Sequence, residues 1–306
     1  MFKALKYIFL AGSILAGLVL ILNFTYTKIT DIPNHIEGQH IAVKDLKLRV
    51  HQVGTGPDVL FLHGSIGSIE DFDTVLPLLK DYRVTMFDRI GHGYSEMPLV
   101  RANLASNAVY ASALIEKLQL KNVIVVGHSY GGSVALKMAI NQTPNVKALV
   151  LIAPASKVAD VRAIEHVFAN TYFGMGLLRI LSPLIAEDML RGGLLESLKP
   201  NLDILPDNFI ETRLKLWNNP GILYTRTQQT SVVQHEIAEM IPRYSSIKLQ
   251  TVILIGEKET HDDISSGAYV LADTIPGAHI QIVKGAGHYL QYKDPVSVRA
   301  AIKRLN

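Results

Sequence analysis

The residue of this sequence best placed to carry out chemistry is Ser129, the centre of a Gly-x-Ser-x-Gly motif over residues 127–131. The motif follows an apolar run over 123–126, which predicts a buried strand, and precedes apolar residues at helical spacing over 133–140. A tight turn from strand to helix holds a serine in a strained conformation that lifts its hydroxyl above the sheet. Glycines on both sides leave room for the close approach of the two backbones. We therefore predict that Ser129 is a nucleophile.

A serine hydroxyl is a poor nucleophile until a base removes its proton, and His288 is the residue best suited to that task. It follows the strand predicted over residues 278–283. In an open α/β sheet the reactive groups gather beyond the carboxyl ends of the strands. Glycines in the preceding loop allow it to approach the serine closely. We predict that His288 accepts the proton of Ser129.

A histidine base needs a carboxylate that fixes its tautomer and stabilises the imidazolium ion. The loop after the strand predicted over residues 249–255 contains Glu259, Asp262 and Asp263. Glu259 is our first choice, and the two aspartates remain alternatives. The order serine, acid, histidine along the chain is the one expected when the nucleophile lies on such a turn.

An acyl-transfer reaction also needs hydrogen-bond donors for the oxyanion of its tetrahedral intermediate. Two backbone N–H groups are suitable: that of Tyr130, directly after the nucleophile, and that of Ser65, in the loop after the strand predicted over residues 59–62. The residues expected to support these two turns are His63, Gly64, Gly127 and Gly131.

The composition excludes several other kinds of site. A net charge of +3 is too small for a nucleic-acid-binding surface, and no Lys/Arg cluster is interleaved with aromatic residues. The absence of cysteine excludes disulfides, a thiolate nucleophile and a cysteine-ligated zinc ion. In the run 235–239 a glutamate stands where the second histidine of a zinc-binding HExxH motif would be. We therefore expect no metal, no cofactor and no nucleic-acid partner.

The order of the elements predicts an α/β fold. Continuous apolar runs that alternate with helical patterns are typical of a parallel sheet with helices on both faces. Residues 46–53 alternate at period two instead, which predicts an antiparallel edge strand, and a helix is expected over 71–79. Between residues 155 and 246 the helical segments are broken by Gly and Pro, which indicates a helical cap (155–246) over the strand ends. The core is then split into residues 39–154 and 247–306.

The N-terminal residues 1–27 predict a membrane segment. Lys3 and Lys6 precede an uncharged stretch over 7–27, close to the roughly 20 residues that a helix needs to cross a bilayer. We expect an uncleaved single-pass anchor with a cytoplasmic N-terminus, which places the catalytic domain on the far, periplasmic or extracytoplasmic, side of the membrane. Secretion after cleavage as a signal peptide is the alternative. Residues 28–38 then form a linker.

Together these motifs resemble those of the α/β-hydrolase superfamily, in its capped branch. The resemblance covers roughly residues 40–306 except the cap, and it includes the run 88–95 and the Gly-His pair at 287–288. It implies a mostly parallel eight-stranded sheet flanked by helices, with the helical cap inserted after strand 6. One departure is that the family usually has Asp where Glu259 stands. The dehalogenases and epoxide hydrolases of the family attack with an aspartate, so Ser129 argues against both.

The expected function is that of a serine hydrolase that cleaves a carboxylic ester or another acyl bond through an acyl-enzyme. A carbon–carbon bond hydrolase is the alternative, and a non-catalytic ligand-binding protein is a further one. The carbon–carbon reaction needs polar groups in the cap, and the arginines available there are Arg162, Arg179, Arg191 and Arg213. The expected partner is a small acyl or ester substrate, lipophilic because of the anchor and the apolar cap. The apolar cap residues are Phe168, Tyr172, Phe173, Met175, Leu177, Leu178, Ile180 and Leu181.

Overall fold

The computed structural model describes residues 6–7, 10, 12–18, 38–158, 188 and 190–306, and no helix among them is long and apolar enough to cross a membrane. We expected such a helix over residues 7–27. Of that range, residues 7, 10 and 12–18 belong to the described part. Residues 19–27 and most of the predicted linker lie outside the described part. The predicted anchor, and the location across a membrane that followed from it, are therefore wrong.

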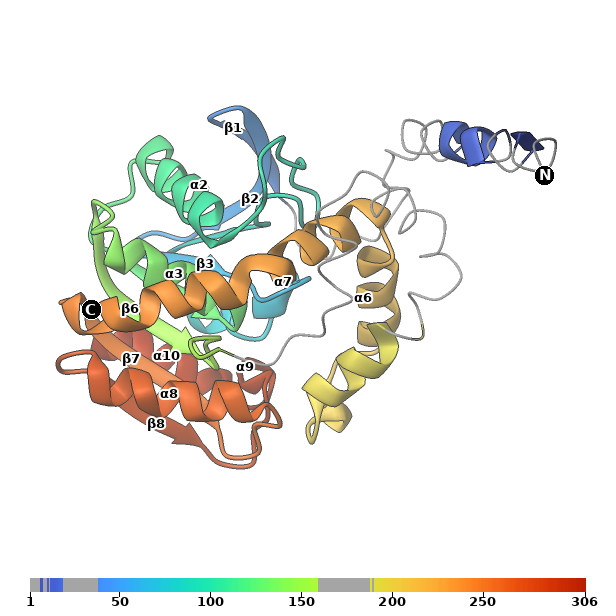
Figure 1. Ribbon diagram of the computed structural model, residues 1–306. Coiled ribbons are helices and arrows are strands. Elements are labelled where there is room, and N and C mark those ends of the chain that lie inside the picture. Colours follow the sequence, from blue (N-terminus) through green and yellow to red (C-terminus); the bar gives the residue numbers. More distant parts are fainter. Residues whose placement is uncertain (1–5, 8–9, 11, 19–37, 159–187, 189) are drawn as a thin grey trace.

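Eight strands form one mostly parallel sheet, which confirms the predicted fold class (Figure 1). The strands are β1 (Gln39–Val43), β2 (Leu46–Val53), β3 (Asp58–Leu62), β4 (Arg83–Phe87), β5 (Val123–His128), β6 (Val146–Ile152), β7 (Gln250–Gly256) and β8 (His279–Val283). Their order in the sheet is β1-β2-β4-β3-β5-β6-β7-β8. Strands β3 to β8 pair in parallel, whereas β2 is antiparallel to both of its neighbours. Every residue of β3 and β5 is buried, as their apolar runs predict.

The alternating strand that we expected at an edge, β2, lies one position inside the sheet. It pairs with β4 on one side, and β1 covers its other side, with Gln39 opposite Val50. Strand β1 is short and has a single buried residue, Val43, so its sequence carries almost no periodic signal. The antiparallel orientation of β2 is as predicted, and its edge position is not.

Helices cover both faces of the sheet. The described helices are α2 (Leu104–Lys117), α3 (Tyr130–Ile140), α6 (Phe209–Trp217), α7 (Pro220–Met240), α8 (Asp262–Thr274), α9 (Leu290–Lys293) and α10 (Pro295–Arg304), with the short 3-10 helices η1 (Ile69–Phe72), η2 (Leu76–Leu78), η3 (Leu202–Ile204) and η4 (Ile241–Ser246). Residues 12–18 and 190–198 are helical as well. Helices α2, α3 and α8 form one layer, joined through η4, and α10 packs with η2 behind the sheet (Figure 1). The helix expected over residues 71–79 is replaced by η1 and η2, because Pro77 has no N–H to continue an α-helix.

The chain between β6 and β7, called the insertion below, is mainly helical from residue 190 to residue 246. It contains α6 and α7, whereas the apolar cap residues named above, all within 168–181, lie outside the described part. The insertion forms a buried apolar cluster that also includes Ile66 and Tyr289 of the core. These two residues directly follow Ser65 and His288. The insertion therefore packs on the loops that carry a predicted oxyanion donor and the predicted base.

Candidate active site

Ser129 lies at the tip of the sharp turn between β5 and α3. Its φ of 51° and ψ of −117° form a conformation that residues with a side chain rarely adopt. Backbone hydrogen bonds hold the turn. The N–H of Ser129 donates to the carbonyl of Ile152 at 2.9 Å, and its own carbonyl accepts from Gly132 at 2.9 Å and from Ala155 at 3.1 Å. The structure thus contains the strained turn that the motif predicts.

The strain at Ser129 leads to a prediction about stability. Glycine adopts a positive φ without the steric cost that a Cβ brings. The free energy gained in this way exceeds the entropic cost of ordering glycine, which is more flexible in the unfolded chain. We expect the free energy of unfolding of Ser129→Gly to be about 1 kcal/mol higher than that of Ser129→Ala. Urea denaturation of the two variants measures the difference. A Ser129→Ala variant as stable as Ser129→Gly would show that the turn stores no strain.

The glycines of the turn are required by the close approach of α3 to β3 and β5. A Cβ at Gly131 would overlap the carbonyl oxygens of Leu62 and His63, and one at Gly127 would overlap the carbonyl oxygen of Gly131. Backbone atoms cannot swing aside as the end of a long side chain can. The two glycines therefore make the turn sterically accessible.

We expect Gly131→Ala to lower the free energy of unfolding by about 1–3 kcal/mol, the usual cost of overpacking, because α3 must move away from β3. Gly192→Ala is a matched control. Gly192 lies in a helical stretch of the insertion, and a Cβ there meets nothing within 4 Å. The control should gain up to about 1 kcal/mol, because alanine is the better helix former. Equal changes in the urea denaturation of the two variants would contradict this account.

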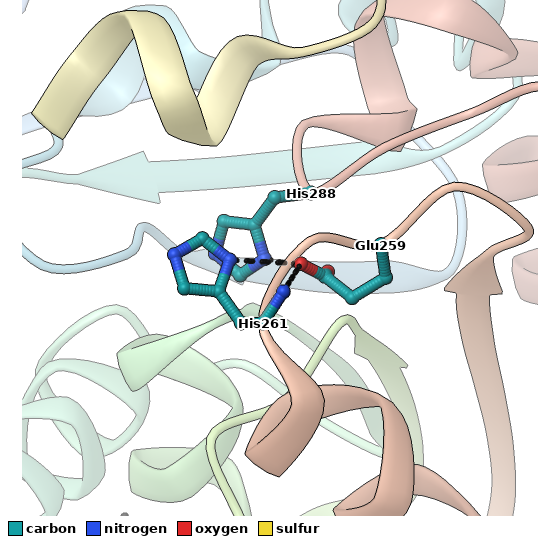
Figure 2. Close-up of side chains that lie close together, drawn as sticks. All are labelled: Glu259, His261 and His288. Atoms are coloured by element: carbon teal, nitrogen blue, oxygen red, sulfur yellow. Dashed lines mark hydrogen bonds and ion pairs between the residues drawn. The ribbon is translucent and has the colours of Figure 1, made fainter. Parts of the chain in front are cut away.

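The predicted base and the first-choice acid contact each other directly. Nδ1 of His288 lies 2.8 Å from Oε2 of Glu259, and only 8% and 1% of the two side chains are exposed (Figure 2). Glu259 follows β7 and His288 follows β8, so two neighbouring parallel strands bring their loops together. Asp262 and Asp263 instead begin α8, and neither forms a hydrogen bond or ion pair with His288 within the described part of the chain. Of the three carboxylates considered, the fold brings Glu259 to the histidine.

This contact fixes the state of both groups. A carboxylate only accepts hydrogen bonds, so Nδ1 of His288 carries a proton and Nε2 keeps the lone pair that a base requires. Burial alone would raise the pKa of Glu259, but the hydrogen bonds from His261 and His288 outweigh it and hold that pKa below its ordinary value. Glu259 is therefore ionised at neutral pH and can stabilise an imidazolium ion on His288.

His128, directly before Ser129, ties the turn to the loop of His288. The two imidazole rings lie 5.0 Å apart, centroid to centroid, and Nε2 of His128 lies 3.1 Å from the carbonyl oxygen of His288. Because a carbonyl only accepts, Nε2 of His128 is the donor. Burial lowers the pKa of His128 to about 3, so this donor is neutral at working pH. The contact brings the loops of the predicted nucleophile and base together, and no local sequence pattern indicates it.

The loop after β3 lies against the Ser129 turn. A Cβ at Gly64 would sit 3.3 Å from Cβ of Ser129 and 3.0 Å from Nδ1 of His128, so a side chain there would crowd the turn. Tyr130 is the first residue of α3, so its N–H group has no carbonyl to donate to within that helix. The N–H of Ser65 has no hydrogen-bond partner among the described residues. Both donors are thus available, and their role in binding an oxyanion stays a prediction.

A buried arginine holds this loop in place. Arg89, 1% exposed, donates from Nε to the carbonyl of His63 at 3.0 Å and from Nη2 to the carbonyl of Gly64 at 2.8 Å. Its backbone N–H donates to Nε2 of His63 at 2.9 Å, so the ring proton of His63 lies on Nδ1, which donates to the carbonyl of Gly64 at 2.9 Å. This network fixes the backbone directly before the N–H of Ser65.

Ile66, next to Ser65, has a second strained backbone conformation, with a φ of 50°. A β-branched residue rarely adopts a positive φ, because its side chain crowds the backbone. The Ile66 side chain is 7% exposed and packs in the apolar cluster shared with the insertion. Its burial holds the strained loop, and the strain lies beside a predicted oxyanion donor, where such conformations are often found in enzymes.

Donor atoms of Glu259, His261 and His288 lie within 4.8 Å of one another. Two histidines and a carboxylate form a ligand set that zinc accepts. Hydrogen bonds of 2.8 Å and 2.9 Å from the two imidazoles to the carboxylate already account for this arrangement. We therefore assign no metal to these residues.

A pocket of about 150 Å³ lies where α6 meets the core. Its lining includes Ser68, Asp73, Thr212 and Arg213, and none of its lining residues belongs to the predicted triad. Arg213 is buried and joins the two parts. Its Nη2 lies 2.8 Å from Oδ1 of Asp71, and its Nη1 donates to Oγ of Ser68 at 2.6 Å. The arginine thus neutralises a buried carboxylate of the core.

Known proteins share this fold over most of the chain. The sequence model of the alpha/beta hydrolase fold family matches residues 57–295. A 2-hydroxymuconate semialdehyde hydrolase of Pseudomonas sp. (strain CF600) is 25% identical over 265 residues, which cover 83% of this chain and 88% of that protein. A 2-(acetamidomethylene)succinate hydrolase of Mesorhizobium japonicum is 24% identical over 276 residues, which cover 88% and 95%. A meta-cleavage product hydrolase (CumD) from Pseudomonas fluorescens IP01 superposes with a TM-score of 0.71 at 20% identity, over 88% of this chain and 97% of that one.

The fold and these comparisons define the class of the protein. The chain belongs to the alpha/beta hydrolase fold family, whose sequence model matches well over half of it. It is a hydrolase of this fold, a class with which the expected small-molecule substrate is consistent. The lipophilic substrate that we expected from the anchor and the apolar cap has no support in the comparisons.

Proposed function

We propose that this protein is a serine hydrolase with Ser129, His288 and Glu259 as its catalytic triad. The observation that carries the proposal is the 2.8 Å contact between Nδ1 of His288 and the buried carboxylate of Glu259, together with the strained turn at Ser129. A buried, ionised acid on one nitrogen of an imidazole makes the other nitrogen a general base.

In the first half of the reaction Ser129 attacks a substrate carbonyl while His288 takes the hydroxyl proton. The charge that develops on the carbonyl oxygen is stabilised by the N–H groups of Ser65 and Tyr130, each worth about 3 kcal/mol in a typical site. Glu259 stabilises the imidazolium ion. His288 then protonates the leaving group, which departs, and the acyl group stays bound to Ser129 as an acyl-enzyme. Water, activated by the same histidine, hydrolyses the acyl-enzyme and frees Ser129.

For the substrate we propose an acid with a conjugated carbonyl group, cleaved at the carbon–carbon bond beside that carbonyl. The relative and the structural neighbour named for 2-hydroxymuconate semialdehyde and for meta-cleavage products support this substrate class. 2-Hydroxymuconate semialdehyde has no ester or amide bond, so its hydrolysis must break a carbon–carbon bond. The proton of its 2-hydroxy group must first move to C5, which turns the dienol into a ketone. The leaving group is then a carbanion conjugated with that ketone, and His288 protonates it.

Cleavage of an ester or lactone is the second proposal, and the pairing of two cap arginines, Arg191 and Arg213, favours it. A substrate carboxylate would need a cation in the cap. Arg213 faces Asp71 instead, and Arg191 pairs with Glu211 at 3.0 Å on the surface. Arg243 donates to the carbonyl of Ile140 at 3.3 Å, and Arg226 is a half-buried residue of α7. Arg162 and Arg179 lie outside the described residues. A neutral ester has no carboxylate, so its binding does not require a free arginine in the cap.

A panel of substrates decides between the two proposals. Purified enzyme is given 2-hydroxymuconate semialdehyde, followed by the loss of its absorbance, and p-nitrophenyl esters of increasing acyl length, with Ser129→Ala as the control. A kcat/KM at least about 100-fold higher for the semialdehyde supports carbon–carbon cleavage, and the reverse ratio supports ester cleavage. Turnover by the Ser129→Ala variant at the wild-type rate would contradict both. If the folded enzyme turns over neither class, the non-catalytic ligand-binding protein replaces both proposals.

A further inference from the structure

Glu259 is held by two histidines rather than one. Its Oε2 accepts from Nδ1 of His288 at 2.8 Å, and its Oε1 accepts from Nδ1 of His261 at 2.9 Å (Figure 2). The backbone N–H of His261 donates to the same Oε1 at 3.1 Å. Each oxygen of the carboxylate therefore has a nitrogen donor, and three hydrogen bonds fix the plane of the group.

These hydrogen bonds matter because the acid is a glutamate. The family resemblance implies an aspartate at this place, and Glu259 has one more methylene group and one more rotatable bond. Ordering a buried glutamate side chain costs rotamer entropy. The side chain is also only 1% exposed, so hydrogen bonds must offset the loss of water around its charge. A second histidine supplies a donor and fixes the direction of the carboxylate.

His261 reaches Glu259 from the side that is open to solvent. It is the residue directly before α8, in an extended conformation that any residue adopts, with φ of −98° and ψ of 105°. Its side chain is 38% exposed, whereas that of His288 is 8% exposed. The two imidazole rings lie 4.9 Å apart, centroid to centroid. His261 thus lies between the pair of Glu259 and His288 and the solvent.

We propose that His261 is a positioning residue that clamps Glu259 in the orientation in which its carboxylate meets Nδ1 of His288. The proposal rests on the catalytic triad proposed above. His261 touches no substrate in it and takes no proton during the reaction, because it acts through Glu259. Nδ1 of His261 is a donor in the imidazolium ion and in the neutral tautomer protonated at Nδ1, so the clamp holds in both protonation states.

The charge of His261 adds a second effect on the base. The ionisable groups that face it are Glu259, His288, Asp263 in α8 and Glu196 in the insertion. The hydrogen bond to Glu259 raises the pKa of His261 above its ordinary value, although burial opposes this. An imidazolium ion at this place disfavours a second positive charge on His288. Removal of the His261 charge should therefore move the acid limb of the pH–rate profile to higher pH.

The test compares His261→Leu with His261→Asn. The asparagine amide nitrogen lies close to the place of Nδ1 and keeps a neutral donor, whereas leucine has no donor. The readout is the second-order rate constant for labelling of Ser129 by a fluorophosphonate probe, from about pH 5 to about pH 9, where histidine titrates. This readout does not depend on the natural substrate. Thermal unfolding of both variants checks that they are folded.

We expect His261→Leu to lower the labelling rate about 10- to 100-fold, as when a reacting group is displaced by about 1 Å. His261→Asn should restore most of the rate, and in both variants the acid limb should lie at higher pH than in the wild type. A wild-type rate and pH profile in His261→Leu would overturn the proposal. So would loss of wild-type labelling in EDTA, since the three donors would then hold a metal ion.

The same measurements separate this proposal from the proposed function. If the wild type and His261→Leu are labelled equally fast, the triad stands and only the clamp is lost. If the folded wild type is not labelled at all, the triad is wrong and the clamp is wrong with it.

Discussion

Ser129→Ala should lower kcat by about 10⁴- to 10⁶-fold on the best substrate of the panel. The substitution removes the atom that forms the acyl-enzyme, so only the oxyanion donors and substrate binding remain to accelerate attack by water. The N–H groups of Ser65 and Tyr130 belong to the backbone and are unchanged, so the substrate should still bind. Steady-state kinetics gives the loss of kcat, and equilibrium titration of the variant with substrate gives the affinity that remains.

Ser245→Ala is the control for this experiment, because Ser245 is an exposed residue of η4. It should keep the wild-type kcat. A folded Ser129→Ala variant that keeps more than about a hundredth of the wild-type kcat would contradict the assignment of the nucleophile.

The second large effect is expected at the acid, where Glu259→Gln should lower kcat by about 10³- to 10⁴-fold. The carboxylate accepts a hydrogen bond at each of its oxygens, from His261 and from His288. A glutamine has a single acceptor oxygen, so its NH₂ group faces one of the two Nδ1–H groups. Where it faces His288, the imidazole must carry its proton on Nε2 and can no longer act as the base for Ser129.

Asp262→Asn and Asp263→Asn are the controls for the acid, since both aspartates begin α8 and neither forms a hydrogen bond or ion pair with His288 within the described residues. Both variants should keep kcat within about twofold, the usual size of the effect of a substitution away from the reacting groups. Activity is measured at the pH optimum of the wild type. If either aspartate variant lost activity while Glu259→Gln kept it, Glu259 would not be the acid.

The same substitution has a pH signature in stability. The pKa of Glu259 is lower in the folded protein than its ordinary value of 4.5, so the ionised carboxylate stabilises the fold above that pH. This contribution is lost as the pH falls through the lower, folded value. The unfolding free energies of wild type and Glu259→Gln should therefore differ at neutral pH and converge in acid. A difference that does not change with pH would show that the ionised carboxylate is not the stabilising form.

The strands of the sheet follow from local sequence to different degrees. Strand β6, Val146–Ile152, is evident from its sequence, because its last five residues are all apolar and all buried. Strand β1 has one buried residue and is recognised only by its pairing with β2. The anchor was expected from the composition of residues 7–27, and no helix of the described residues is long and apolar enough to cross a membrane.

The candidate site shows the same division. Ser129 and His288 stand in glycine-containing turns that local sequence reveals, because the backbone there needs residues without a side chain. The contacts that position them do not follow from local sequence. His261 contacts Glu259 two residues away in the same loop, in a hydrogen bond that no recognised sequence pattern indicates. His128 meets the backbone of His288 only because β5 and β8 lie in one parallel sheet. Such partners come from distant segments, so their spacing along the chain carries no signal.

The most direct test of the triad is the mapping of a covalent adduct. The wild-type enzyme is incubated with a fluorophosphonate probe, digested and analysed by mass spectrometry, with Ser129→Ala treated in parallel. The account predicts one adduct, on Ser129, and none in the variant. An adduct on another residue, or a folded wild-type enzyme without any adduct, would contradict the claim that Ser129 is the activated nucleophile.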